Sequence, residues 1–441
     1  MQATAINMID MVGIGPFVTI PLIIGAMNGP QSILAWLLGA LLAFMDGFVW
    51  SELGAAMPMA GGSYQFLRKI YGEKKWGLLM SFLYIWQTVI QAPLVIASGA
   101  IGFAMYAQYL IPLSAFEQKV VAGGVIIVIY VLLNRRIASV GRLSVLLWTG
   151  VIFTIGWLIF GGLSHFDPVL AFTYPENAFQ FNMLFFAGLG NASIKTVYSY
   201  LGYYNVCHLG GEIRQPEKNI PRSIFISIAG IASLYLLMQI CILGVIPWEQ
   251  ARDSSFIVSL FFEAIYGKTA ATIATVMILW IALSSLFAVM LGYSRVPYAA
   301  AVDGNFFSVF ARVHPVKKIP HISLMILAAT AFVFSLMFKL KEVITAIIVM
   351  RILIQFVGQA AGVIYLRHKK DPLQLPYRMW LYPVPAVSAI IIWLFIFFSS
   401  GWNYILGASG IILAGCFIFL LRARSLAEWP FYKSGIEKDA S

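Results

Sequence analysis

Long apolar stretches separated by short polar connections run along the whole 441-residue chain. About 20 helical residues cross the roughly 30 Å hydrocarbon core of a bilayer, so stretches of this length predict membrane-crossing helices. The pattern predicts an all-α integral membrane protein with about twelve transmembrane helices, and it leaves too little chain between them for a second, water-soluble domain. The apolar segments are residues 3–27, 31–56, 76–107, 119–133, 143–163, 182–211, 222–246, 268–298, 321–338, 342–366, 381–399 and 403–421.

The composition excludes a soluble enzyme. Apolar residues make up 61% of the chain and charged residues 11%, against roughly 45–50% and about 25% in soluble domains. No cleavable signal peptide precedes the first segment, which is therefore expected to remain in the mature protein. The three cysteines, Cys207, Cys241 and Cys416, all lie in apolar segments and form neither a disulfide framework nor a paired metal-ligand spacing.

The basic residues are distributed unevenly between the two sides of the predicted membrane. Of the 29 lysines and arginines, 22 lie in one set of alternating loops and in the C-terminal tail, and only five lie in the opposite loops. Because positively charged loops stay in the cytoplasm, both termini are predicted to be cytoplasmic. This topology, with anionic lipid as the partner of the basic loops, accounts for the net charge of +11, so no nucleic acid partner is expected.

Two apolar segments carry residues that interrupt a helix. The first contains Gly13-Ile14-Gly15-Pro16, in which two glycines leave the α conformation easily and the proline suits the first turn of a restarted helix. The sixth carries Tyr200-Leu201-Gly202-Tyr203 near its centre. Interrupted helices at matching positions of two five-helix halves indicate a transporter binding site. The alternative is that these glycines only let neighbouring helices pack closely.

Four motifs in order along the chain resemble those of the amino acid–polyamine–organocation superfamily, close to its amino acid permeases. Each motif alone is a weak signal, but the four lie in the right order and on the same predicted side of the membrane. The motifs are Glu52-Leu53 with residues 58–64 (PMAGGSY), residues 212–222 (EIRQPEKNIPR), residues 294–304 (SRVPYAAAVDG) and residues 375–377 (LPY) with Tyr382-Pro383.

The resemblance implies a leucine-transporter-like fold, with ten core helices in two inverted five-helix repeats and two peripheral helices. The first repeat is then 1–163, the second 182–366, the peripheral pair 381–421 and the cytoplasmic tail 422–441. The implied function is secondary active transport of amino acids across the plasma or inner membrane by alternating access, without covalent chemistry. Some relatives are tethered to a heavy subunit through a cysteine between the third and fourth helices. Residues 109–117 contain no cysteine, so no covalent heavy subunit is expected.

Carried over from the family, Gly13–Gly15 and Tyr200–Gly202 are the unwound parts of the first and sixth helices. A free helix N-terminus offers N–H groups and the positive dipole end to a carboxylate, and free carbonyls at the other helix ends suit an ammonium group. Neighbouring tyrosines are expected to read the substrate side chain. The expected substrate-binding residues are Met11, Gly13, Ile14, Gly15, Tyr198, Tyr200, Leu201, Gly202 and Tyr203.

Two cations lie inside predicted helices, Lys195 and Arg351, and Gln355 follows Arg351 by one turn. A charge at the centre of the bilayer costs about 2.5–3.5 kcal/mol on insertion scales, so each calls for an explanation. The functional interpretation places Lys195, Arg351 and Gln355 in an outer vestibule that gates access and attracts an anionic or zwitterionic substrate. The alternative is that each cation pairs with a carbonyl or reaches a water-filled cavity for packing reasons alone.

The coupling ion has candidates for both a proton and a sodium ion. Asp10, one turn before Gly13, is a candidate proton carrier or simply a solvated residue. The hydroxyls of Ser284 and Ser285, with the Val12 carbonyl, offer the oxygen ligands of a sodium site, although serines in membrane helices often bond back to their own helix. Many proton-coupled or exchanging relatives have a lysine in the fifth helix, where the stretch from Leu147 to Ile152 has none. The chain also lacks H-E-x-x-H, Walker and nucleophile-elbow motifs, so no metal or other cofactor is expected.

Rival functions remain at this point. A carrier of polyamines or other organic cations would have acidic residues lining its site, and only Asp10 is close. A non-transporting amino acid sensor would have a signalling domain, and only 17 residues follow Arg424. A membrane-embedded enzyme would have clustered histidines or paired carboxylates at depth. Exchange and ion-coupled symport are both compatible with the sequence.

Overall fold

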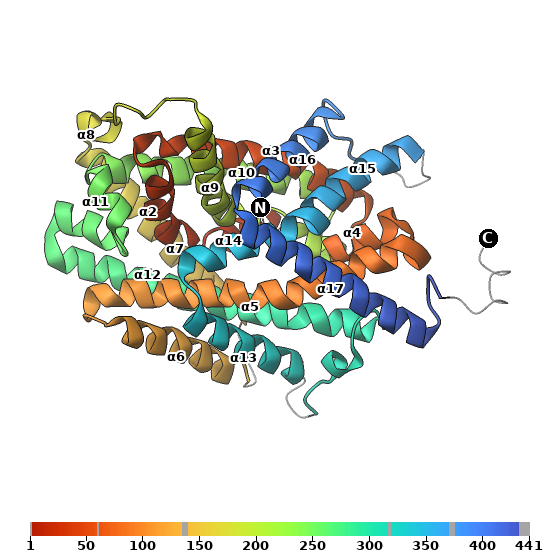
Figure 1. The fold of residues 1–441 in the computed structure, drawn as a ribbon. Helices are drawn as coiled ribbons and strands as arrows, with labels where there is room; N and C mark the ends of the chain where they lie inside the picture. The colour runs from red at the N-terminus through yellow and green to blue at the C-terminus, as the bar shows by residue number, and fades with distance from the viewer. Residues whose placement is uncertain (1, 60, 135–139, 316–318, 370–374, 432–441) are drawn as a thin grey trace.

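A computed structural model describes residues 2–59, 61–134, 140–315, 319–369 and 375–431 (Figure 1). Across these residues the regular secondary structure is helical, without a β-strand, which confirms the predicted all-α class. Among the described residues, seven helical stretches are long and apolar enough to cross a membrane, so the protein is an integral membrane protein. They are Pro30–Ala56, Gly72–Leu110, Ala115–Leu133, Pro216–Leu243, Ile257–Val302, Leu340–Lys369 and Trp402–Leu426, and shorter apolar helices are Gly15–Met27, Gly150–Ser164, His321–Met337 and Val384–Ser399.

Every apolar segment of the sequence contains at least one α-helix. In the N-terminal half the helices are α1 (Gln2–Met11), α2 (Gly15–Met27), α3 (Ile33–Ala56), α4 (Ser63–Ile70), α5 (Gly77–Leu110), α6 (Ala115–Leu133) and α7 (Val140–Ser164). In the C-terminal half they are α8 (Pro168–Phe172), α9 (Met183–Tyr200), α10 (Pro216–Leu243), α11 (Trp248–Asp253), α12 (Ile257–Val302), α13 (His321–Met337), α14 (Leu340–Arg351), α15 (Gly358–Lys369), α16 (Val384–Ser399) and α17 (Trp402–Leu426).

Helices far apart in the sequence lie side by side in the bundle. The long helices α5 and α12 run next to each other with α6 and α13 beside them, and α3 packs against α10 (Figure 1). Polar side chains join α3 to α10: Trp36 Nε1 donates to Gln239 Oε1 at 2.5 Å, and Gln239 Nε2 donates to Ser32 Oγ at 2.9 Å. Such bonds between apolar helices satisfy groups that lipid cannot satisfy.

Some predicted segments are interrupted or extended. Within α12 the backbone leaves the helical conformation at Gly267, where φ is 79°, so the helix bends before its long apolar part. The predicted segment 342–366 consists of α14, a π-helical turn at Ile352–Val357 and α15.

The family-like motifs meet at one end of the bundle, where α4, α15 and the end of α17 lie (Figure 1). Glu52 accepts two hydrogen bonds from Arg367, in the last turn of α15, and one from the Met379 N–H, so it holds the end of that helix. The Gly61 N–H donates to the His208 carbonyl at 3.3 Å, so the first motif loop packs against the segment after α9.

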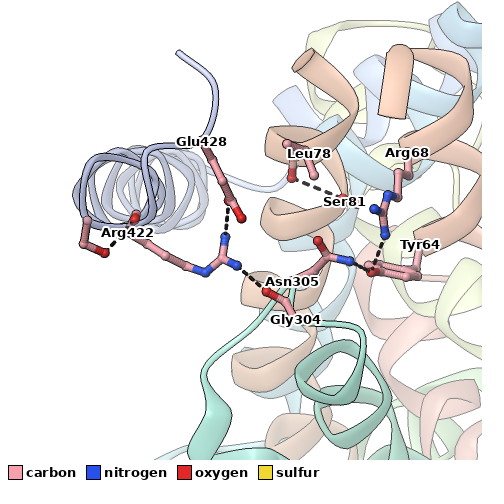
Figure 2. Close-up of polar contacts among 9 residues, drawn as sticks. Tyr64, Arg68, Leu78, Ser81, Gly304, Asn305, Arg422 and Glu428 are labelled. Carbon is pink, nitrogen blue, oxygen red and sulfur yellow. Dashed lines mark hydrogen bonds and ion pairs between the residues drawn. The ribbon is translucent and has the colours of Figure 1, made fainter. Parts of the chain in front are cut away.

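A chain of polar contacts at the same end joins α17, the segment after α12 and α4 (Figure 2). Arg422 donates to Glu428 at 3.1 Å and to the Gly304 carbonyl. The side-chain amide of Asn305 donates to the Tyr64 hydroxyl, which also accepts from Arg68 at 3.3 Å (Figure 2). Helix α17 is thereby connected to the segment after α12 and, through it, to α4.

Candidate functional site

The first helix interruption lies where the sequence predicts it. Helix α1 ends at Met11, residues 12–14 are not helical, and α2 begins at Gly15 with Pro16 in its first turn. The Met11 carbonyl, which has no partner within its own helix, accepts a hydrogen bond from the Tyr235 hydroxyl at 2.8 Å. Part of the backbone exposed by the interruption is therefore satisfied by α10, as non-helical backbone at membrane depth requires.

The second interruption follows α9, which ends at Tyr200. The chain turns at Gly202, where φ is 116°, and continues as a 3₁₀-helix, Asn205–His208. A Cβ atom at Gly202 would lie 2.9 Å from the Asp10 carbonyl carbon and 2.9 Å from the Met11 nitrogen. Only glycine fits this left-handed turn at this distance, so Gly202 brings the two interruptions into contact.

The two interruptions expose backbone groups of opposite polarity. Among the hydrogen bonds of the described residues, the N–H groups of Gly13, Ile14 and Gly15 donate none. In the same set of bonds, the carbonyls in the last turn of α9, at residues 198–200, accept none. The start of α2 therefore presents unpaired donors and a positive dipole end, and the end of α9 presents unpaired acceptors and a negative one.

A cavity of about 100 Å³ lies between these helix ends. Its volume is below the roughly 300–1,000 Å³ of sites for drug-sized ligands, which favours a small solute. Seven of the nine expected substrate-binding residues line it: Met11, Gly13, Ile14, Gly15, Tyr198, Leu201 and Gly202. The other lining residues are Asp10, Gln91, Val95, Gly99, Ser199, Tyr204, Ser285, Leu286, Val289, Tyr293, Ile347 and Arg351.

Tyr200 and Tyr203 do not line the cavity. The Tyr200 ring contacts Trp36 edge to face, with ring centres 5.7 Å apart, and its hydroxyl donates to the Trp36 carbonyl at 3.3 Å. The Tyr203 hydroxyl donates to Asp46 at 2.5 Å. Both side chains face α3 because the chain turns between them, and the structure places Tyr204 at the cavity instead.

The two cations within the helices have different surroundings. Arg351 lines the cavity, is 7% exposed, and donates from Nε to Gln355 Oε1 at 2.5 Å. Gln355 in turn donates to Ser63 Oγ at 3.0 Å and does not line the cavity. Lys195 is buried outside the cavity and donates to the Asn191 carbonyl at 2.7 Å, an arrangement that favours the packing alternative for this residue.

Some of the coupling-ion candidates line the cavity and others do not. Asp10 and Ser285 line the cavity, and a Cβ atom at Gly13 would lie 2.6 Å from Ser285 Oγ. Ser284 donates to the Trp280 carbonyl at 2.6 Å, which is the back-bonded alternative, and Val12 is buried outside the cavity. In the stretch from Leu147 to Ile152, which has no lysine, the side chains of residues 147–149 lie outside the described residues. Within the described part of the chain, no group of three or more His, Cys, Asp or Glu side chains is placed to hold a metal ion.

The sequence patterns did not predict several of the residues that line the cavity. Gln91 lines the cavity, and its buried Nε2 has no hydrogen-bond partner within the described structure. Tyr293 precedes the third motif and gave no separate signal. A polar residue at the centre of an apolar helix, as at Gln91, was the one available indication.

Residues 1–422 match the family described as amino acid permease. The chain therefore belongs to the amino acid permeases, which are membrane transporters and not enzymes. It is 25% identical to the serine/threonine exchanger SteT of Bacillus subtilis, over 82% of this chain and 81% of that protein. It is 24% identical to the branched-chain amino acid permease BcaP of the same organism, over 90% and 86% of the two chains. It is also 24% identical to the aspartate-proton symporter of Bacillus subtilis, over 90% and 78%.

Proposed function

We propose that this amino acid permease binds its substrate in the cavity between α2 and the end of α9 and moves it by alternating access. The observation that carries the proposal is the meeting of unpaired N–H groups and unpaired carbonyls at one small cavity. The N–H groups of Gly13–Gly15 receive the α-carboxylate, and the last-turn carbonyls of α9 receive the α-ammonium group. These contacts use only what all α-amino acids share.

The same proposal includes the twelve-crossing layout, with helices α1 to α7 and α9 to α15 as two inverted halves and α16 and α17 as the peripheral pair. The interruptions after α1 and after α9 fall at corresponding places of the two halves, which supports this assignment. The excess of basic residues around α4, α15 and the end of α17 supports a cytoplasmic position for that end of the bundle and for both termini. The host membrane is then the plasma or inner membrane.

We assign the coupling of transport to an ion to the two candidate groups that face the cavity, Asp10 and Ser285. A proton would be carried by Asp10, and a sodium ion would be held by the Ser285 hydroxyl with backbone carbonyls of the first interruption. Exchange of one amino acid for another needs neither. No covalent heavy subunit is included, because residues 109–117 offer no cysteine.

The test is uptake of labelled amino acids into proteoliposomes by the wild type and by Gly15→Leu. A Cβ atom at Gly15 would already lie 3.2 Å from the Tyr198 ring, so a leucine side chain must enter the space between α2 and α9. Uptake is expected to be lost while membrane insertion is retained. Gly407→Leu is the matched control, because Gly407 is exposed on α17 and a Cβ atom there meets no atom within 4 Å.

Normal uptake by Gly15→Leu would refute the site. Wild-type uptake that needs preloaded amino acid but no gradient identifies an exchanger, while dependence on a sodium or proton gradient identifies a symporter and its ion. Absence of uptake of every amino acid under all these conditions would refute the transport proposal and favour a polyamine carrier or a sensor.

A further inference from the structure

The Arg351 side chain is a buried cation that faces the cavity and forms no direct ion pair with a carboxylate of the described residues. Of the ion pairs that the described residues form, none includes Arg351 or Asp10, although both line the cavity. The Asp10 carboxylate attracts Arg351 electrostatically but is not in ion-pair contact with it. A buried guanidinium that contacts no carboxylate is costly, and in membrane proteins such a group usually serves a substrate or an ion.

The contacts of Arg351 hold its guanidinium in one orientation. Nε is occupied by Gln355, which Ser63 holds from the other side. The guanidinium carbon lies 5.7 Å from the centre of the Tyr204 ring and 5.6 Å from that of Phe356. The Tyr204 side chain also interacts with the guanidinium. The two Nη groups contact no carboxylate of the described residues, and they form one end of a planar fork that matches the two oxygens of a carboxylate.

An unpartnered side-chain donor lies in the same cavity. Gln91 on α5 is 1% exposed, and its Nε2 has no hydrogen-bond partner among the described residues. A buried amide without a partner is uncommon, so it is a second, independent indication that a ligand with acceptor atoms belongs here.

We infer that Arg351 selects amino acids whose side chain ends in a carboxylate. This inference rests on the proposed function. The α-carboxylate already has a place at the N–H groups of Gly13–Gly15, and the α-ammonium has one at the carbonyls of α9, where Asp10 adds a negative charge. The group left to meet Arg351 is the substrate side chain, and the cavity volume of about 100 Å³ favours aspartate over glutamate.

The competing assignment places the α-carboxylate itself on Arg351, in which case the side chain is not selected. Aspartate and asparagine distinguish the two assignments, because they have nearly the same shape and differ in side-chain charge. Their apparent dissociation constants are measured by thermal-shift titration of the purified protein, which reports binding without requiring transport.

The wild type is expected to bind aspartate at least tenfold more tightly than asparagine. Arg351→Gln is expected to weaken aspartate binding by about 10- to 100-fold, the range for a charge-assisted hydrogen bond. Asparagine binding should change by less than about threefold, because the asparagine side chain carries no charge for Arg351 to pair with. Arg351→Lys keeps the charge but loses the fork, so an intermediate preference is expected; it also serves as the test if Arg351→Gln does not fold. Lys195→Gln, which removes a buried cation outside the cavity, is the matched control. It should leave the ratio of the asparagine to the aspartate dissociation constant unchanged.

Equal weakening of aspartate and asparagine binding by Arg351→Gln would overturn the inference, because Arg351 would then hold the α-carboxylate. A wild type that binds asparagine, serine or leucine as tightly as aspartate would also overturn it, while leaving amino acid transport intact. Binding of malate, which lacks the ammonium group, without binding of any amino acid would refute the proposed function itself.

Discussion

Glu52 on α3 and Arg367 on α15 form an ion pair in which the two charges are unequally buried. The Glu52 side chain is 0% exposed and that of Arg367 is 17% exposed. The two hydrogen bonds between them measure 2.8 and 2.6 Å, and Glu52 also accepts from the Met379 N–H at 2.7 Å. Arg367 also lies over the Tyr382 ring, 4.1 Å from its centre. Neutralising either partner leaves the other charge behind, but in different surroundings.

Because of this asymmetry, Arg367→Gln is expected to destabilise the protein more than Glu52→Gln. The first leaves a fully buried carboxylate, for which the loss of a buried partner costs about 3–5 kcal/mol. The second leaves a cation that can reach solvent and keeps an acceptor for Met379, so about 1.5–3 kcal/mol is expected. At roughly 2 °C per kcal/mol, the falls in Tm are about 6–10 °C and about 3–6 °C.

The assay is thermal unfolding of the detergent-solubilised variants, followed by tryptophan fluorescence at one fixed heating rate, since unfolding of such proteins is often irreversible. The double variant, which leaves neither charge uncompensated, is expected to lose less stability than the two single losses added together. The reasoning fails if Glu52→Gln is as damaging as Arg367→Gln, or if the two losses simply add.

Two further predictions concern the cavity. Ser285→Ala removes a hydroxyl that lines the cavity, so the initial uptake rate at low substrate is expected to fall about fivefold, the effect of one hydrogen bond of about 1 kcal/mol. Ser284→Ala, at a hydroxyl bonded to its own helix, should keep the wild-type uptake rate. Equal uptake rates in the two variants would show that Ser285 has no role in the binding site. Gly202→Ala is expected to lower Tm and abolish binding, because φ is 116° there and a Cβ atom would press on Met11. Gly304→Ala, at a φ of 73° with no atom within 4 Å of the new Cβ, should cost only about 1 kcal/mol and leave binding intact, so equal losses would contradict the proposed contact.

The sequence by itself determined which segments are helical and apolar and where the backbone leaves the helix at the site. Both properties are local: a bilayer selects apolar runs of a given length, and Gly13-Ile14-Gly15-Pro16 interrupts a helix wherever it stands. The end of α9 before Gly202 is also determined locally, because glycine readily leaves the helical conformation. For this reason the glycines expected at the site do line the cavity.

Only the tertiary structure decided which side chains face that cavity. Tyr200, Tyr203 and Tyr204 are near neighbours of similar chemistry, yet Tyr204 alone lines the cavity, because Trp36 and Asp46 on α3 engage the other two. The direction of a side chain depends on how its helix is rotated against helices distant in sequence, and a local pattern does not contain that rotation. Arg351 and Lys195 show the same principle: both are cations in apolar helices, but one faces the cavity and the other bonds to its own helix.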